Sequence, residues 1–386
     1  MRSSRACLAR TLLAGIWVFG VPLLCAAQAE ETVDAAASIY VRQDTNETTV
    51  ISPRVRAGAE VADGTRADVT YTVDVWTSAS VDIVTAATPS VTEQRDELDV
   101  RITQSFSDLS LTAGYRYSNE HDYLSHGASL GGTLDLAQNN TTLDVAFTAL
   151  FDEVGQAGNP NFALQANTFG VRGGLTQVLD ADTLLQLVYE LGMLDGYLSS
   201  PYRRVPIADN EELLGTTCVV VAVKPTSPVT CIPEVNPNSR MRHALAARGR
   251  RALGEVLSVG LAYRFYLDDW SIMSHTAEGD IAWVPSEAWL LSLGYRFYTQ
   301  SAASHYKPFY TRADQQEGKH FTSDKELSPM TGHRVSLEVT RSIGSQEDSN
   351  MRVVLLIAPS FYSYSDFPRL NSISALEATL ALEFVL

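Results

Sequence analysis

Beyond residue 25 the sequence lacks any apolar run that approaches the ~20 residues needed for a membrane-spanning helix. It is also short of basic residues, with 29 Lys and Arg against 45 Asp and Glu and a formal net charge of −16. This acidity argues against nucleic acid as a partner. The chain is therefore either soluble or a membrane barrel, and only the spacing of its apolar residues can distinguish the two.

The N-terminus has the pattern of an export signal. Three arginines within the first ten residues precede an apolar run at 12–24, and Ala27-Gln28-Ala29 forms a small-x-small cleavage pattern. These features predict a secretory signal peptide at 1–29, cleaved near Ala29. A membrane anchor is the alternative, but the run is short for a span. Leu24 precedes Cys25 where a lipoprotein signal has a small residue, which argues against lipidation.

Cysteine is scarce, with four in the whole chain and two of them in the predicted signal peptide. Cys218 and Cys231 remain, both within a stretch that reads as a loop. Because export leads to an oxidising compartment, we expect a local Cys218–Cys231 disulfide. It would stabilise the fold by ~3 kcal/mol on the chain-entropy model. Two free thiols are the alternative.

What the chain does contain is strict alternation. From Asp68 to Val75, valines and a tyrosine fall on one face while aspartates and threonines fall on the other. A strand turns successive side chains to opposite faces, so this segment predicts one apolar and one polar face. Roughly ten-residue segments of this kind recur to the end of the chain, for an estimated total of about 16 strands. We predict an all-β fold, with residues 30–386 forming one antiparallel up-and-down transmembrane β-barrel; a soluble β-sandwich is the alternative.

The lengths of the connections also alternate. Short turns are expected at Asp63-Gly64, Ser107-Asp108, 138–140, 180–182 and Pro285-Ser286, and long loops at 79–92, 199–238 and 301–331. Outer-membrane barrels have short periplasmic turns and long extracellular loops. This rhythm therefore predicts an exported protein of a bacterial outer membrane, in contact with outer-membrane lipids.

The last residues form a strand that alternates from Leu376 to Leu386. Pairing of this strand with the first would close the sheet and leave no unpaired edge in lipid. The segment is similar to the C-terminal signal read by the outer-membrane assembly machinery, although it ends in Leu386 where most such signals end in Phe or Trp.

Three segments resemble motifs of a bacterial outer-membrane family that is catalogued only as a domain of unknown function. The segments are 51–55 (ISPRV), 71–82 (YTVDVWTSASVD) and 295–300 (YRFYTQ), of which Trp76 to Asp82 is the most specific. The resemblance covers nearly the whole mature chain. It implies a barrel in the outer membrane, and it implies no reaction or substrate.

A Tyr-Arg motif recurs at Tyr115-Arg116, Tyr263-Arg264 and Tyr295-Arg296. We expect the rings to form an aromatic girdle at the lipid boundary and the arginines to point into the lumen. The candidate lumen residues are Arg54, Arg56, Asp74, Arg116, Glu190, Arg264, Glu278, Asp280, Arg296 and Glu338. One hypothesis is that Arg116, Arg264 and Arg296 select anions near the outer mouth. The alternative, which we favour, is that lumen arginines pair with lumen carboxylates.

No strong catalytic motif is present. Ser125-His126 places its two side chains on opposite faces of a strand, and Asp268-Asp269 with His275 reads as an ordinary turn. Residues 119–122 supply oxygen ligands and one His without a full calcium set, and the remaining histidines lack zinc spacing. We therefore predict a protein without enzymatic activity, cofactor or metal.

The polar inward faces favour a water-filled lumen, because buried charges are costly unless they are wet or paired. We predict a passive, porin-like channel for small polar solutes. The alternative is a closed structural or surface-binding barrel that acts through its extracellular loops. An outer-membrane hydrolase is the least favoured.

Overall fold

The computed structural model describes residues 33–78, 91–208, 229–344 and 350–385. The predicted signal peptide and Cys218 lie outside these described residues. No helix within them is long and apolar enough to cross a membrane.

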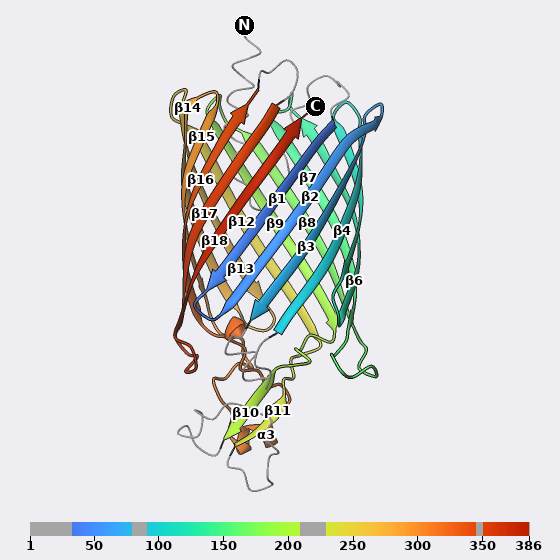
Figure 1. The fold of residues 1–386 in the computed structure, drawn as a ribbon, viewed down its shortest axis with the longest axis vertical. Coiled ribbons are helices and arrows are strands. Elements are labelled where there is room, and N and C mark those ends of the chain that lie inside the picture. Colours follow the sequence, from blue (N-terminus) through green and yellow to red (C-terminus); the bar gives the residue numbers. More distant parts are fainter. Residues whose placement is uncertain (1–32, 79–90, 209–228, 345–349, 386) are drawn as a thin grey trace.

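Sixteen strands form a closed antiparallel barrel, as predicted (Figure 1). Each strand pairs with its neighbour in sequence, except that β9 pairs with β12 because β10 and β11 form a separate hairpin. The barrel strands are β1 Val33–Asp44, β2 Thr48–Ala62, β3 Thr65–Ser78, β4 Val91–Ser105, β5 Leu109–Asn119, β6 Tyr123–Leu136, β7 Thr141–Val154, β8 Leu164–Val178, β9 Thr183–Gly196, β12 Ser239–Ala252, β13 Leu257–Asp268, β14 Met273–Ser286, β15 Trp289–Gln300, β16 Met330–Ile343, β17 Asn350–Tyr364 and β18 Ser372–Val385.

The last strand closes the barrel. β18 pairs with β1 along its length, from Asp34 opposite Val385 to Asp44 opposite Ala375. This confirms the prediction made from the alternating C-terminal segment. Closure leaves no unpaired sheet edge among these strands, which a lipid environment requires.

The alternation places apolar side chains outside and polar ones inside. Leu130, Leu261 and Leu293 are 64%, 69% and 56% exposed on the outer surface. On the inner face, Arg264 of β13 reaches Glu190 of β9 across the intervening strand β12. Exposed apolar side chains on this scale are stable only against lipid, so the barrel spans a membrane.

The two ends of the barrel differ, and we call them the turn end and the loop end. At the turn end, where β1 begins and β18 ends in Figure 1, the connections include 63–64, 106–108, 137–140, 179–182, 253–256 and 287–288. The turn predicted at Pro285-Ser286 is wrong by two residues. β14 continues to Ser286 because the pairing register shifts between Trp283 and Ser286, which lengthens the strand before the turn.

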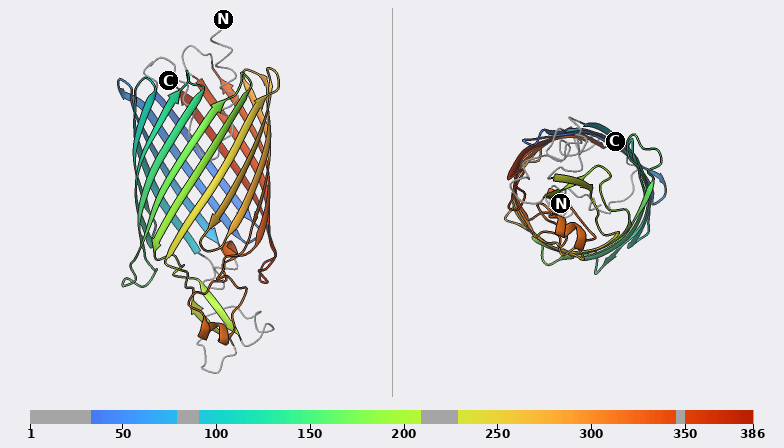
Figure 2. Two further views of the ribbon diagram at one scale, coloured as in Figure 1. Left: turned by 180° about the vertical axis from the view of Figure 1, so that it is seen from behind. Right: turned by 90° about the horizontal axis from the view of Figure 1, so that it is seen from below.

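At the loop end, residues 197–208, 229–238 and 301–329 pack together into what we call the loop layer. It contains the hairpin of β10 (Arg204–Ala208) and β11 (Val229–Pro233), the helix α3 (Arg312–Glu317) and a short 3₁₀ turn at Lys325–Leu327. Seen along the barrel axis, these elements lie within the outline of the barrel (Figure 2). The sequence predicted only loops here.

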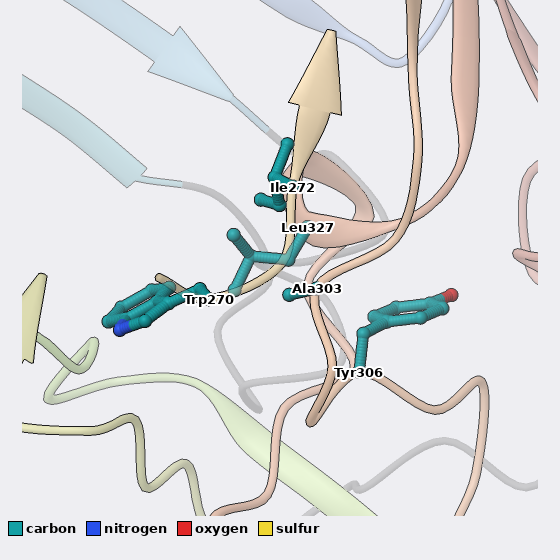
Figure 3. Packing of buried hydrophobic residues seen from close by; sticks show 5 residues of the cluster. All are labelled: Trp270, Ile272, Ala303, Tyr306 and Leu327. Carbon is teal, nitrogen blue, oxygen red and sulfur yellow. The ribbon is translucent and has the colours of Figure 1, made fainter. Parts of the chain in front are cut away.

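Two small apolar cores hold the loop layer together. One joins Val205 and Ile207 of β10, both fully buried, to Tyr310 and Phe321. The other consists of Trp270, Ile272, Ala303, Tyr306 and Leu327, and Figure 3 shows Leu327 and Ala303 between the rings of Trp270 and Tyr306. The layer therefore has its own packing, which fixes it over the mouth of the barrel.

Candidate functional site

All ten predicted lumen residues lie on the inward face of the barrel wall, and most are paired. Their pairings are Arg56 with Asp68, Asp74 with Arg95, Arg116 with Glu97, Arg264 with Glu190, Arg296 with Glu278 and Asp280 with Arg250. Arg54 donates from Nε to Oγ1 of Thr72 at 3.1 Å. Glu338 lies opposite Ser292 and Leu356 on the neighbouring strands. The arginines are thus largely matched with carboxylates.

These ion pairs run along the wall of the barrel. The partners lie on adjacent strands, as with Arg116 of β5 and Glu97 of β4, or on strands two places apart, as with Arg264 and Glu190. Pairs of the second kind pass over small residues. Arg250 of β12 reaches Asp280 of β14 over Gly260 of β13, where any side chain would collide with both. None of these pairs bridges the lumen from one wall to the opposite wall.

The inward face of β12 is a row of arginines that the sequence analysis missed. Arg240, Arg242, Arg248 and Arg250 all point inward, and β12 has no inward carboxylate. Three contact other strands: Arg240 bonds to Asp268 of β13 from Nε at 2.9 Å, Arg248 to Gln186 of β9 at 3.4 Å and Arg250 to Asp280 of β14. The Nε atom of Arg242 is buried without a hydrogen-bond partner in the described structure. We call these four residues the β12 arginine row.

The even spacing of these arginines in the sequence could have revealed the row. The arginines occupy positions 240, 242, 248 and 250, so they share one face of any strand. Ala244 and Ala246 lie between them on the same face, and the outward residues of β12 include His243 and Arg251. The contrast between the two faces is therefore weak, so the segment could be counted as a strand but its arginine row was not recognised.

A cavity of about 480 Å³ lies between the loop-end part of β12 to β15 and the loop layer. We call it the vestibule. Its charged lining consists of Arg203, Arg240, Arg242, Arg264 and Arg296 with Glu234, Asp324 and Glu326. Positive charge exceeds negative charge there. Of the predicted arginine cluster, Arg264 and Arg296 line the vestibule, whereas Arg116 lies on β5 beside Glu97.

A buried carboxylate fixes the roof of the vestibule. The side chain of Glu234 is fully buried and accepts hydrogen bonds from the Ser200 backbone N–H at 2.8 Å and the Thr322 hydroxyl at 2.6 Å. Arg203 lies 3.3 Å from Glu234 and 2.7 Å from Asp324. These contacts join the two loops that form the layer, so the roof is a defined structure.

His305 joins the roof to the barrel rim. Its Nε2 donates to Oδ1 of Asn236 at 3.0 Å, and its ring contacts the edge of Trp270 with centroids 5.0 Å apart. Trp270 in turn lies 4.3 Å from the guanidinium of Arg240. Burial, together with nearby His320 and Arg240, lowers the pKa of His305 to about 4. His305 is therefore neutral where it packs against this cation.

The other predicted groups are dispersed. His126 bonds outward to Tyr115 while Ser125 lies on the opposite face of β6. Asp268 accepts from Arg240, Tyr266 and the Ile272 backbone, and His275 lies outward on β14. Cys231 lies in β11, and because Cys218 lies outside the described residues the disulfide stays a prediction.

The fold and the site together define a membrane-spanning β-barrel with a charged lumen and a structured loop layer. The chain belongs to the family described as "Protein of unknown function (DUF3570)", whose model matches residues 81–170 and 163–355. This confirms the resemblance to a domain of unknown function. No curated protein matches the sequence.

Several solved structures are similar in fold and distant in sequence. The siderophore receptor PirA of Acinetobacter baumannii is 10% identical with a TM-score of 0.45, covering 87% of this chain and 54% of the receptor. This chain thus spans about half the length of that receptor. A bacterial polysaccharide outer membrane secretin (8% identity, TM-score 0.48, 92% and 97% covered) and OprD of Pseudomonas aeruginosa (9%, 0.43, 92% and 95%) are also similar. These are likenesses of barrel shape alone.

Proposed function

We propose that this protein is an outer-membrane channel for the passive diffusion of small polar solutes. The observation that carries the proposal is the direction of the lumen ion pairs, which follow the wall and, among the described residues, do not bridge the lumen. A plugged barrel would instead tie opposite walls of the lumen together through its charges. A barrel of 16 strands is wide enough to hold an aqueous passage.

The architecture of the barrel supports the proposed location in the outer membrane. The strand number is even, β1 begins and β18 ends at the turn end, and the loop layer lies at the other end. In bacterial outer-membrane barrels the short turns are periplasmic and the long loops are extracellular. The vestibule is therefore the extracellular entrance, and its lipid-facing wall contacts outer-membrane lipids.

The entrance favours anions. Arg264 and Arg296 lie in solvent-exposed pairs with Glu190 and Glu278, so their fields largely cancel. The excess positive charge comes from the β12 arginine row, because β12 has no inward carboxylate; Arg242 lies at the vestibule and Arg248 lies beside Gln186 deeper in the lumen. Fixed charges along a wet pore select ions of opposite sign.

The test is the reversal potential of single channels under a potassium chloride gradient. The unchanged protein should prefer chloride, and Arg242→Gln with Arg248→Gln should lower the chloride-to-potassium permeability ratio by at least about twofold. Arg341→Gln is the matched control, because Arg341 lies on the outer face over the ring of Trp289. An unchanged ratio in the double variant would remove the β12 arginine row from the proposal.

One observation favours a second candidate function, binding of a ligand at the cell surface. The loop layer has two apolar cores and a buried Glu234 network, more structure than a passive entrance needs. A barrel that gives no conductance steps but binds through this layer would fit this alternative. The described residues offer no assembled catalytic group that would favour a hydrolase.

A further inference from the structure

The lipid-facing surface carries a repeated side-chain pair that the channel does not explain. In five strands that run from the turn end to the loop end, the seventh residue is an outward tyrosine. Each tyrosine hydroxyl bonds to a polar side chain on the following barrel strand. The pairs are Tyr71 with Asp96 (2.5 Å), Tyr115 with His126 (2.8 Å), Tyr189 with His243 (2.8 Å), Tyr263 with His275 (2.6 Å) and Tyr295 with His333 (2.7 Å).

The geometry is the same in each pair. The histidine lies opposite the residue two positions beyond the tyrosine, as with His275 opposite Phe265 and His333 opposite Phe297. These phenylalanine rings contact the imidazoles at centroid distances of 5.2 and 5.3 Å. Since each tyrosine is seventh in its strand, the pairs lie at one height around the barrel.

This height is the loop-end edge of the apolar band. On β14, the outward residues from the turn end upward are Trp283, Ile281, Gly279 and Ala277, and His275 is the first polar one. On β6 the outward residues from Leu136 to Ala128 are likewise apolar or Gly until His126. Eight residues of tilted strand rise by about 20 Å, close to the ~25 Å height of the apolar band in such barrels. The histidines therefore reach the level of lipid headgroups.

The hydrogen bond to tyrosine engages Nδ1 of each imidazole and leaves Nε2 facing outward. When the tyrosine O–H donates to Nδ1, the neutral ring carries its proton on Nε2. None of the four Nε2 atoms meets a hydrogen-bond acceptor within the described part of the chain. Each ring thus presents an N–H donor to the surrounding lipid. A donor at this depth is costly unless an acceptor satisfies it.

We propose that His243, His275 and His333 form an arc that binds the phosphate groups of lipids in the loop-side leaflet. The three residues lie on β12, β14 and β16, so they recur every second strand, about 10 Å apart. This spacing lets neighbouring headgroups each meet one donor. His126 lies on β6, four strands away from β12, and at Tyr71 the partner is the carboxylate of Asp96, which repels phosphate, so the arc is confined to one side of the barrel.

The test is native mass spectrometry of the purified barrel with phosphatidylglycerol and an uncharged glycosyl-diacylglycerol of the same acyl chains. The unchanged protein should retain phosphatidylglycerol preferentially. The triple variant His243→Phe, His275→Phe, His333→Phe should lower that preference about tenfold, from the loss of hydrogen bonds to a charged acceptor. Leu261→Phe, Leu293→Phe, Leu337→Phe is the matched control, since it adds three rings to the same wall below the arc.

Folding of each variant is checked by its heat-dependent migration in detergent gels, and His275→Phe alone serves if the triple variant does not fold.

A second set of variants, Tyr189→Phe, Tyr263→Phe and Tyr295→Phe, frees Nδ1 of the histidines. It should weaken the preference for phosphatidylglycerol in part, because the proton is no longer held on Nε2. Retention of the full phosphatidylglycerol preference by the folded histidine variants would overturn the proposal, as would an equal loss in the leucine control. The measured lipid preference does not depend on whether the barrel conducts ions.

Discussion

Single residues on the inward face decide which charges can meet. Glycine is used where an arginine and a carboxylate must meet over an intervening strand. Gly58 lies beneath the Arg66 side chain, which pairs with Asp34 two strands away. Gly260 plays the same part beneath Arg250 and Asp280. Without these gaps the charges would separate or turn into the lumen.

Gly260→Ala tests this use of glycine. A Cβ at this position would collide with Oδ1 of Asp280 and lie 2.6 Å from Nη2 of Arg250. Separating this pair, whose side chains are 12% and 19% exposed, should lower the free energy of unfolding by about 1–3 kcal/mol. Urea unfolding in lipid vesicles measures it. Gly173→Ala is the control, because a Cβ there meets nothing within 4 Å and should cost almost nothing.

At the scale of elements, the loop layer should respond to pH through His305. Its folded pKa of about 4 lies below its ordinary value of 6.5, so the unfolded loop binds the proton more readily. Stability of the layer is therefore full above pH 6.5 and falls as the pH drops toward 4. The groups around His305 are His320, Arg240 and Asp268.

Limited proteolysis measures this response, with each rate normalised to cleavage of an unstructured peptide at the same pH. Cleavage within 301–329 should accelerate between pH 6.5 and 4.5 in the unchanged protein. His305→Gln keeps an amide donor for Asn236 but does not titrate, so its cleavage rate should stay flat over the same range. A parallel rise in both proteins would assign the effect to other groups.

The barrel strands could be predicted from sequence because period-two alternation is a local property. Segments such as Asp68 to Val75 need no knowledge of their neighbours. Contacts between strands depend on the pairing register, which the sequence does not reveal. The Tyr263–His275 pair and the Arg264–Glu190 pair could therefore be identified only in the structure. The β10–β11 hairpin was missed because its five-residue strands are short and carry Pro206 and Pro233.

At the scale of the whole molecule, charge is distributed unevenly around the lumen. β9 and β12 together carry four inward arginines and one inward glutamate, Glu190. Elsewhere, pairs such as Arg116 with Glu97 balance the wall. These contacts agree with the interpretation, favoured from the sequence, that lumen arginines pair with lumen carboxylates. The excess of positive charge on β12 could not be recognised from the sequence, because it depends on the order of the strands in the barrel. An electrostatic field that is more positive along one wall of the lumen, beneath a structured entrance, fits a channel that selects ions by charge.

The most direct measurement is single-channel conductance of the mature protein, refolded and inserted into a planar lipid bilayer. The proposed channel predicts discrete conductance steps that add in equal units and prefer chloride over potassium. Silence from protein that is shown to be folded by its heat-dependent gel migration would contradict the open lumen. The function would then have to lie in the loop layer and the surface around Glu234.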